Sequence, residues 1–170
     1  MDVADRTLHV IDLENLVGGT DAGPDELRAA WDAYRGHGIR IAEDDHVVIA
    51  TSSHVARVAW FALPATGMQR LVRDGQDGAD LALVEAVDID HAATRYGRMV
   101  IASGDHAFTD LALDARAHHM RVQLVIGRGQ PSRQLMAACP SRTWLRLDDT
   151  VGLAAYRAGR FRRAAQGLAA

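Results

Sequence analysis

Short apolar runs alternate along the chain with segments in which apolar residues recur at helical spacing. Six runs are rich in β-branched residues, which is typical of buried strands. They are residues 7–13, 46–51, 69–73, 98–103, 121–126 and 143–147. The helical patterns fall between them, at residues 24–35, 54–63, 79–95, 106–118 and 131–138. This alternation predicts an α/β fold, a three-layer α/β/α sandwich with a central, mostly parallel sheet.

The length of 170 residues suits one domain with a substantial core. We place this domain at residues 1–150 and expect the Arg- and Ala-rich segment 151–170 to form a C-terminal helix or tail. No apolar run approaches the ~20 residues that cross a bilayer, and the N-terminus does not resemble a signal peptide. We therefore expect a cytoplasmic protein with no membrane partner, either a monomer or a homodimer.

The charged residues exclude several classes of function. All 19 basic residues other than histidine are arginine, so mechanisms that need a lysine, such as that of P-loop NTPases, are excluded. The formal net charge of −3 argues against a protein that coats nucleic acid nonspecifically, but it permits an arginine patch beside an acidic site. The single cysteine, Cys139, has no partner for an internal disulfide or a thiolate zinc site, and we expect it in the core.

Acidic residues fall where the predicted strands end. Asp12 ends the first strand, Asp105 follows the strand at 98–103, and Asp80 opens a helix after a turn that contains Asp77. The functional crevice of an open parallel sheet lies beyond the carboxyl ends of its strands, so these side chains are expected at one edge. Each acid taken alone is also explained as a helix cap or strand-end residue. Together they predict a site for a hard divalent cation, because uncompensated carboxylates repel one another.

Four short blocks contain these acids and their neighbours. They are VIDLENL at residues 10–16, DGADLAL at 77–83, IASGDHAF at 101–108 and VIGRGQPSRQL at 125–135. They follow one another in the order of the motifs of the NYN family, and over residues 7–149 the chain resembles these PIN-like ribonuclease domains.

The resemblance implies a PIN-like fold and an endoribonuclease that depends on Mg²⁺ or Mn²⁺ and hydrolyses RNA phosphodiester bonds. It puts Asp12, Asp80 and Asp105 on the family's acidic positions and Asn15 on its asparagine. Ser103 falls where the wider family often keeps a hydroxyl. We therefore predict Asp12, Asp80 and Asp105 as metal ligands and, with Asn15, as catalytic residues, and Ser103 and Asp77 as auxiliary ones.

The chain departs from the family pattern in its third block. Family members often carry a second acid two residues after the first, and here that residue is Ala107. The missing carboxylate weakens a second metal position more than the first. Asp110 is an auxiliary candidate, but five helical residues from Asp105 turn its side chain about 140° away, so we expect at most a water-mediated contact. His106 is a candidate general base or phosphate contact.

Without lysine, contacts to the phosphates of RNA must come from arginine, whose planar fork binds phosphate oxygens bidentately. We predict Arg73, Arg128 and Arg133 in this role, because they lie near strand ends or helix starts at the acidic edge. Gly127 and Gly129 resemble half of a dinucleotide-binding fingerprint. The third glycine and the acidic partner of that fingerprint are missing, so no such site is expected.

The residues leave three functions open. The first is a metal-dependent ribonuclease, which the acids and the four blocks favour. The second is a PIN-like domain that binds RNA or a protein without cleaving, which Ala107 and the modest net charge favour. The third is a metal-dependent nuclease or phosphatase acting on DNA or on small phosphate esters, because carboxylates at a metal site select phosphate chemistry and not the sugar.

Overall fold

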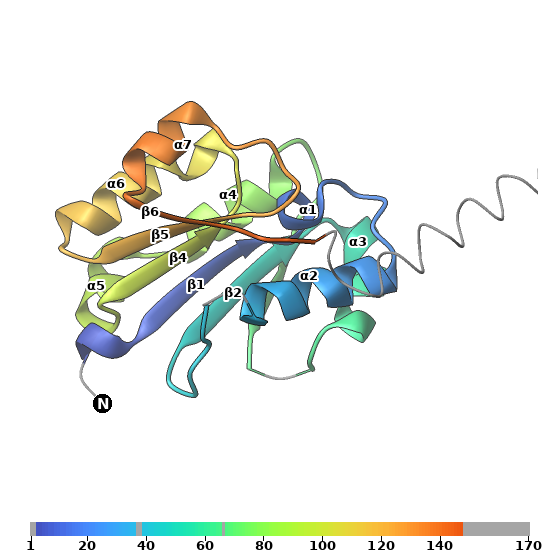
Figure 1. Cartoon of the computed structure of the whole chain (residues 1–170), viewed down its shortest axis with the longest axis horizontal. Helices are drawn as coiled ribbons and strands as arrows, with labels where there is room; N and C mark the ends of the chain where they lie inside the picture. The colour runs from blue at the N-terminus through green and yellow to red at the C-terminus, as the bar shows by residue number, and fades with distance from the viewer. Residues whose placement is uncertain (1–2, 37–38, 66, 148–170) are drawn as a thin grey trace, which may run out of the picture.

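A parallel sheet of six strands lies at the centre of the computed structural model, which describes residues 3–36, 39–65 and 67–147 (Figure 1). The strands are β1 Thr7–Asp12, β2 His46–Thr51, β3 Gln69–Val72, β4 Arg98–Ala102, β5 Arg121–Ile126 and β6 Ser141–Trp144. Their order is β3-β2-β1-β4-β5-β6, and every neighbouring pair is parallel. The predicted α/β sandwich with a parallel sheet is confirmed.

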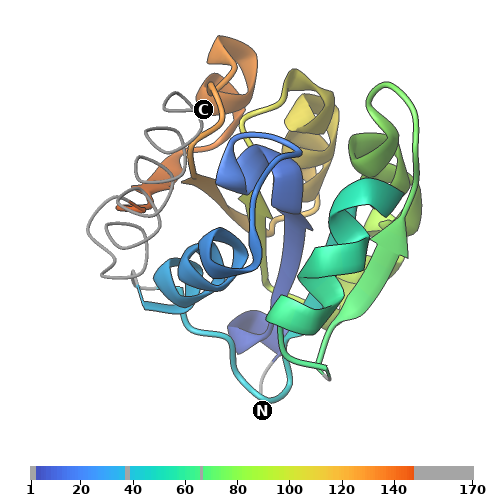
Figure 2. The same cartoon turned by 90° about the vertical axis from the view of Figure 1, so that its right-hand side faces the viewer.

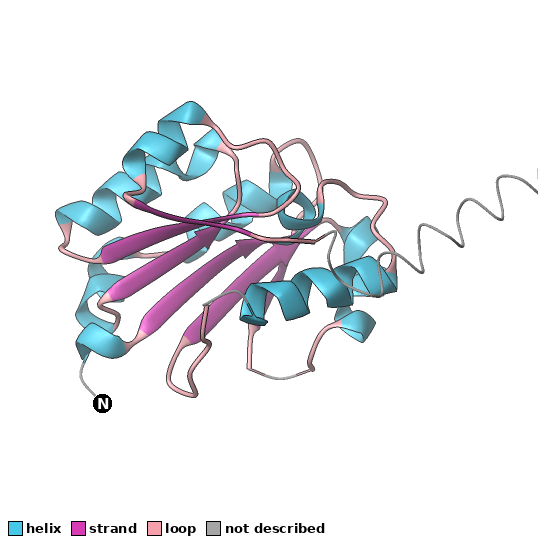
Figure 3. Ribbon diagram, in the orientation of Figure 1, coloured by secondary structure: helices cyan, strands magenta, loops and turns pink. Residues whose placement is uncertain are grey.

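Helices cover both faces of this sheet (Figure 3). They are α1 Leu13–Val17, α2 Pro24–Gly36, α3 Ser53–Ala62, α4 Gly78–Ala86, α5 Ile89–Arg95, α6 Thr109–Ala117 and α7 Arg133–Ala138. Side chains of α1, α2 and α3 pack into one apolar cluster, and those of α4, α5, α6 and α7 pack into a second cluster on the other face. Figure 2 shows α1 at the end of β1 that lies away from the N-terminus.

The central strands are buried on both faces, which explains why they read as continuous apolar runs. In β1, Val10 packs into the cluster under α4 to α7, whereas its neighbour Ile11 packs into the cluster under α2 and α3. Val10 lies in register with Val48 of β2 and with Ile101 of β4. Cys139 is buried in the cluster under α4 to α7, as predicted, and burial raises the pKa of its thiol to about 11.

The strand order creates a crevice at the carboxyl edge. The chain runs from β1 outward through β2 to β3 and then returns to the other side of β1 to form β4. The connections after β1 and β4 therefore leave in opposite directions, and a crevice opens between them where ligands of such sheets bind. The acids that follow β1 and β4 lie at this point.

Two predicted helices are interrupted. The helix predicted at 79–95 ends at Ala86, and a second helix begins after Asp88, whose carboxylate accepts a hydrogen bond from the His91 amide at 3.0 Å. The helix predicted at 106–118 begins as the 3₁₀ turn η2 His106–Phe108 before α6. Asp88 thus caps the new start of α5, because its short side chain satisfies an amide that has no helical partner. Asp105 caps η2 in the same way, whereas α6 follows η2 without a side-chain cap.

Other differences concern the ends of elements. Helix α1 is absent from the sequence prediction, which continued the first strand to residue 13, and the last strand runs over Ser141–Trp144 instead of 143–147. A short 3₁₀ turn, η1 Val3–Asp5, precedes β1. The predicted C-terminal segment 151–170 lies outside the described residues, so its helix or tail stays a prediction.

Candidate active site at the carboxyl edge of the sheet

Asp12 lies at the point where β1 ends and α1 begins, and the residue is 4% exposed. One carboxylate oxygen, Oδ1, accepts a hydrogen bond from the Asn15 amide at 3.1 Å, which caps α1. The other, Oδ2, accepts a hydrogen bond from Ser103 Oγ at 3.0 Å. The strand end and the helix start together fix this carboxylate in the crevice.

Asp80 enters the same crevice from α4. The turn before this helix places Asp77 in the left-handed region with φ 56°, and a Cβ at Gly78 would lie 2.6 Å from the Arg73 carbonyl oxygen. The turn therefore needs glycine at position 78 for steric reasons. It places Asp80 in the first turn of α4, where the residue is 7% exposed.

The two buried carboxyls face each other. Asp80 donates a hydrogen bond to Asp12, and the pKa of Asp80 is raised to about 8, first by burial and then by the negative charge of Asp12. Burial also raises the pKa of Asp12. The charges of Asp105 and Asp77 raise the pKa of Asp80 further. Without a cation, the pair therefore shares a proton at neutral pH.

Asp105 stands at the rim of this pair. Its Oδ1 accepts a hydrogen bond from the Ala107 amide and lies 2.9 Å from His106 Nδ1, while the His106 side chain is 76% exposed. Ser103 connects Asp105 to Asp12, because its hydroxyl accepts from the Asp105 amide at 3.1 Å and donates to Asp12. The predicted auxiliary residue Ser103 is therefore buried between the two acids.

The donor set suits a hard cation in its chemistry. The carboxyl atoms that could coordinate a cation at this point are oxygens. A divalent cation would relieve the repulsion between the two buried carboxyls, which share a proton without it. Within residues 3–36, 39–65 and 67–147, no group of three or more His, Cys, Asp or Glu side chains is arranged to hold a metal ion. Mg²⁺ is commonly bound by one or two carboxylates together with waters and substrate phosphates, so Asp12 and Asp80 fit it.

Asn15 ties three segments together. Its side-chain Oδ1 accepts a hydrogen bond from the Gly104 amide at 2.7 Å, and its backbone carbonyl accepts one from the Gly129 amide at 3.0 Å. A Cβ at Gly129 would lie 2.1 Å from Asn15 Oδ1. The glycine pair at 127 and 129, which suggested no site in the sequence, is thus a close backbone contact that holds the loop after β5 against α1.

Glu14 is a site residue that the sequence did not single out. Its Oε1 accepts hydrogen bonds from Thr51 Oγ1 at 2.9 Å and from the Ser52 amide at 2.7 Å. These bonds join α1 to the end of β2. The position of Glu14, two residues after Asp12, was the available signal, but its partners come from a distant strand.

A cleft of about 430 Å³ opens at these groups, and its lining includes Asp12, Glu14, Asn15, Asp77 and Asp80. Two of the predicted RNA-binding arginines also line it. Arg73 pairs with Glu85 at 2.7 Å, and Arg128 pairs with Glu26 at 3.2 Å.

The remaining predicted residues lie outside the lining of this cleft. Arg133 is exposed at the start of α7. Asp110 is exposed in the first turn of α6, and it is not among the charges that shift the pKa of Asp80. The rotation assumed for a helix beginning at Asp105 does not apply, because η2 intervenes before α6.

Comparison with known proteins adds a fold and a family. A protein of unknown function from Vibrio parahaemolyticus has a similar crystal structure, with a TM-score of 0.52 and 15% sequence identity over 85% of this chain and 94% of that one. This likeness shows the fold alone. No curated protein matches the chain, and no helix among the described residues has the length and apolar character of a membrane span.

The model of the NYN domain matches residues 11–146. The match begins inside β1, ends beyond β6 and contains every acid of the crevice. It therefore covers most of the chain, and the protein belongs to the NYN domain family, within the PIN-like nucleases.

Proposed function

We propose that the protein is a metal-dependent endoribonuclease that hydrolyses RNA phosphodiester bonds in the cleft above Asp12 and Asp80. The observation that carries this proposal is the pair of facing, buried carboxyls at the switch point of the sheet, where the pKa of Asp80 rises to about 8. Burying two acids against each other destabilises the fold. Such an arrangement is retained for a ligand that compensates the charge, and membership of a nuclease family supports a phosphate chemistry.

Asp12 and Asp80 would hold Mg²⁺ or Mn²⁺, with Asp105 at the rim. The bound cation would lower the pKa of water and neutralise charge on the phosphate. Ser103 orients the Asp12 carboxylate through its 3.0 Å hydrogen bond, and Asn15 fixes the loop that carries Asp105 by accepting from the Gly104 amide. These bonds keep the carboxylates in position before substrate arrives.

The cleft also contains groups for the flanking phosphates. Arg73 and Arg128 line it together with the acids, and each is next to a glutamate that orients its guanidinium. A phosphate entering the cleft would meet donors of these arginines. His106 is exposed beside Asp105 and is available to contact substrate. Arg133, exposed at the start of α7, is a further candidate for a phosphate contact.

A cleavage assay tests the proposal. Labelled single-stranded RNA, DNA of the same sequence and p-nitrophenyl phosphate are incubated with the protein in Mg²⁺, Mn²⁺ or EDTA. We expect RNA cleavage that requires a divalent cation. The Asp12→Asn and Asp80→Asn variants should each lose more than about 100-fold, which exceeds the effect of residues that only orient a ligand. Asp90→Asn removes the same charge from the exposed start of α5 and is the matched control.

The substrates separate the alternatives. Cleavage of DNA or of the small ester with RNA left intact would replace the ribonuclease by another phosphate hydrolase. RNA binding without cleavage in any cation would identify a binding domain. Equal activity of Asp80→Asn and Asp90→Asn would remove the carboxyl pair from the reaction.

A further inference from the structure

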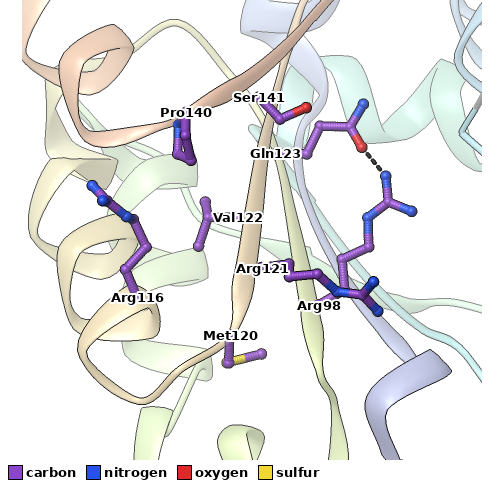
Figure 4. A pocket seen from close by; sticks show the side chains of 8 residues that line it. All are labelled: Arg98, Arg116, Met120, Arg121, Val122, Gln123, Pro140 and Ser141. Carbon is purple, nitrogen blue, oxygen red and sulfur yellow. Dashed lines mark hydrogen bonds between the residues drawn. The ribbon is translucent and has the colours of Figure 1, made fainter.

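A second cavity, of about 450 Å³, lies at the amino-terminal edge of the sheet, at the opposite end from the acidic cleft. Figure 4 shows the residues that line it. It forms where β4 and β5 begin with Arg98 and Arg121. The pairing of β6 with β5 starts only at Gln123, which is in register with Ser141. The edge of β5 is therefore left uncovered by β6 at its first two residues, and we call the resulting cavity the arginine notch.

Three arginines line the notch: Arg98, Arg116 and Arg121. Among the residues that the structure describes, no acidic residue lines it. In the described part of the chain none of the three arginines forms an ion pair within 4 Å. Each is held instead by a neutral oxygen. Arg98 donates to the Gln123 side chain, Arg116 donates to the Ala138 carbonyl at 3.0 Å, and Arg121 donates to the Ala4 carbonyl.

These bonds orient the guanidinium groups without neutralising them. A guanidinium has five N–H donors, and the bonds above use one nitrogen of each. Three like charges around one cavity repel one another unless an anion is bound. The notch thus differs from the acidic cleft, whose lining contains both carboxylates and two arginines.

The arginines approach the edge of β5 from both faces of the sheet. Arg98 and Arg121 are register partners on neighbouring strands and lie on the same face as Gln123. Arg116 comes from α6, which packs on the other face. Figure 4 shows Arg116 on one side of β5 and Arg98 with Arg121 on the other. Arg98 and Arg121 are therefore the two arginines that one anion on this face of the sheet would contact.

The notch is not purely basic. Met120, Val122 and Pro140 supply apolar surface, and Gln123 and Ser141 supply neutral hydrogen-bonding groups. Its volume falls within the range of small-molecule sites, roughly 300–1,000 Å³. Strands of this length separate the notch from the acidic cleft by roughly 20 Å. Volume, apolar surface and separation favour a small ligand over an RNA strand.

We propose that the arginine notch binds a small phosphorylated compound of about the size of a nucleoside monophosphate. The phosphate would bind Arg98 and Arg121, which lie on the same face of the sheet, and the rest of the ligand would pack on Met120, Val122 and Pro140. This site is independent of the acidic cleft and of the proposed nuclease activity.

Calorimetric titration tests the notch in EDTA, which prevents any metal-dependent binding at the acidic cleft. The probes are a nucleoside monophosphate, inorganic phosphate and the parent nucleoside. We expect the monophosphate to bind more tightly than either of its parts. Arg121→Gln should weaken binding at least about 10-fold, and Arg98→Gln with Arg121→Gln at least about 100-fold, because charge-assisted hydrogen bonds are lost.

The matched control is Arg57→Gln with Arg95→Gln, which removes the same two charges from exposed positions outside the notch. It should change the affinity less than about 3-fold. Equal losses in the control and the notch variants would overturn the proposal. So would nucleoside binding as tight as monophosphate binding, no binding at millimolar probe, or preferential capture of a long RNA. Arg121→Gln alone, at an exposed side chain, keeps the test valid if the double variant does not fold.

Discussion

Replacing Gly127 by alanine should destabilise the protein and displace its active site. A Cβ at this position would lie 2.0 Å from the Leu16 carbonyl oxygen and 2.9 Å from Leu16 Cα, whereas ordinary contacts begin at 3.4 Å. The obstacle is the backbone of α1, which cannot rotate away like a side chain. The loop after β5 must therefore separate from α1 by about 1.4 Å, the difference between the 2.0 Å approach and an ordinary 3.4 Å contact.

The cost follows from what this separation breaks. Two backbone hydrogen bonds cross the contact, from the Arg128 amide to the Leu16 carbonyl and from the Gly129 amide to the Asn15 carbonyl, each at 3.0 Å. Losing them costs about 1 kcal/mol each. Overpacking adds roughly 1–3 kcal/mol, so the free energy of unfolding should fall by about 3–5 kcal/mol. For a chain of this length, Tm should fall on the order of 10 °C.

Urea unfolding followed by circular dichroism measures this loss. Gly36→Ala is the matched control, because it makes the same substitution at the end of α2, where no atom of the described residues lies within 4 Å of the new Cβ. It should be neutral or slightly stabilising. A Gly127→Ala protein as stable as Gly36→Ala would refute the reasoning that the glycines fit the loop against α1.

Three further predictions concern charge. In EDTA at pH 9, above the pKa of Asp80 of about 8, Asp80→Asn should raise Tm by ~2–8 °C in thermal melts, because it ends the repulsion with Asp12; an unchanged or lower Tm would contradict this. His9 is buried, and burial lowers its pKa below 6.5, so as the pH falls the unfolded state binds the proton before the folded state does. The free energy of unfolding, measured by urea titration, should therefore decrease as the pH falls through 6.5. A His9→Gln variant with the same pH dependence would exclude this cause. Asp110→Asn should keep RNA cleavage within about 3-fold of wild type, whereas Asp105→Asn should lose at least about 10-fold in the same assay, and equal losses would make Asp110 part of the site.

Much of the architecture is readable from local patterns. A strand buried on both faces is mostly apolar, so the runs that became β1, β2, β4 and β5 are visible without a structure. Element ends were predicted less well. The break between α4 and α5 depends on whether Asp88 caps a new helix or points to solvent, and packing decides between these outcomes.

The candidate site, likewise, was predictable from the sequence only in part. The sequence by itself determined that Asp12, Asp80 and Asp105 stand at strand ends or helix starts, because residue order and periodicity are local properties. It did not determine that Ser103 donates to Asp12, 91 residues away, or that Asp80 faces Asp12 closely enough to share a proton. These contacts follow from the strand order β3-β2-β1-β4-β5-β6.

The roles of the arginines and of the glycines could be recognised only from the tertiary structure. Arg98, Arg116 and Arg121 belong to three different elements, and nothing in their spacing shows that they line one cavity. Gly127 and Gly129 suggested half of a nucleotide motif, whereas their hydrogen bonds with α1 show a close backbone approach. The physical reason is common to both. Local propensity selects helices and strands, but charge repulsion, burial and steric exclusion act between residues that only the folded chain brings together.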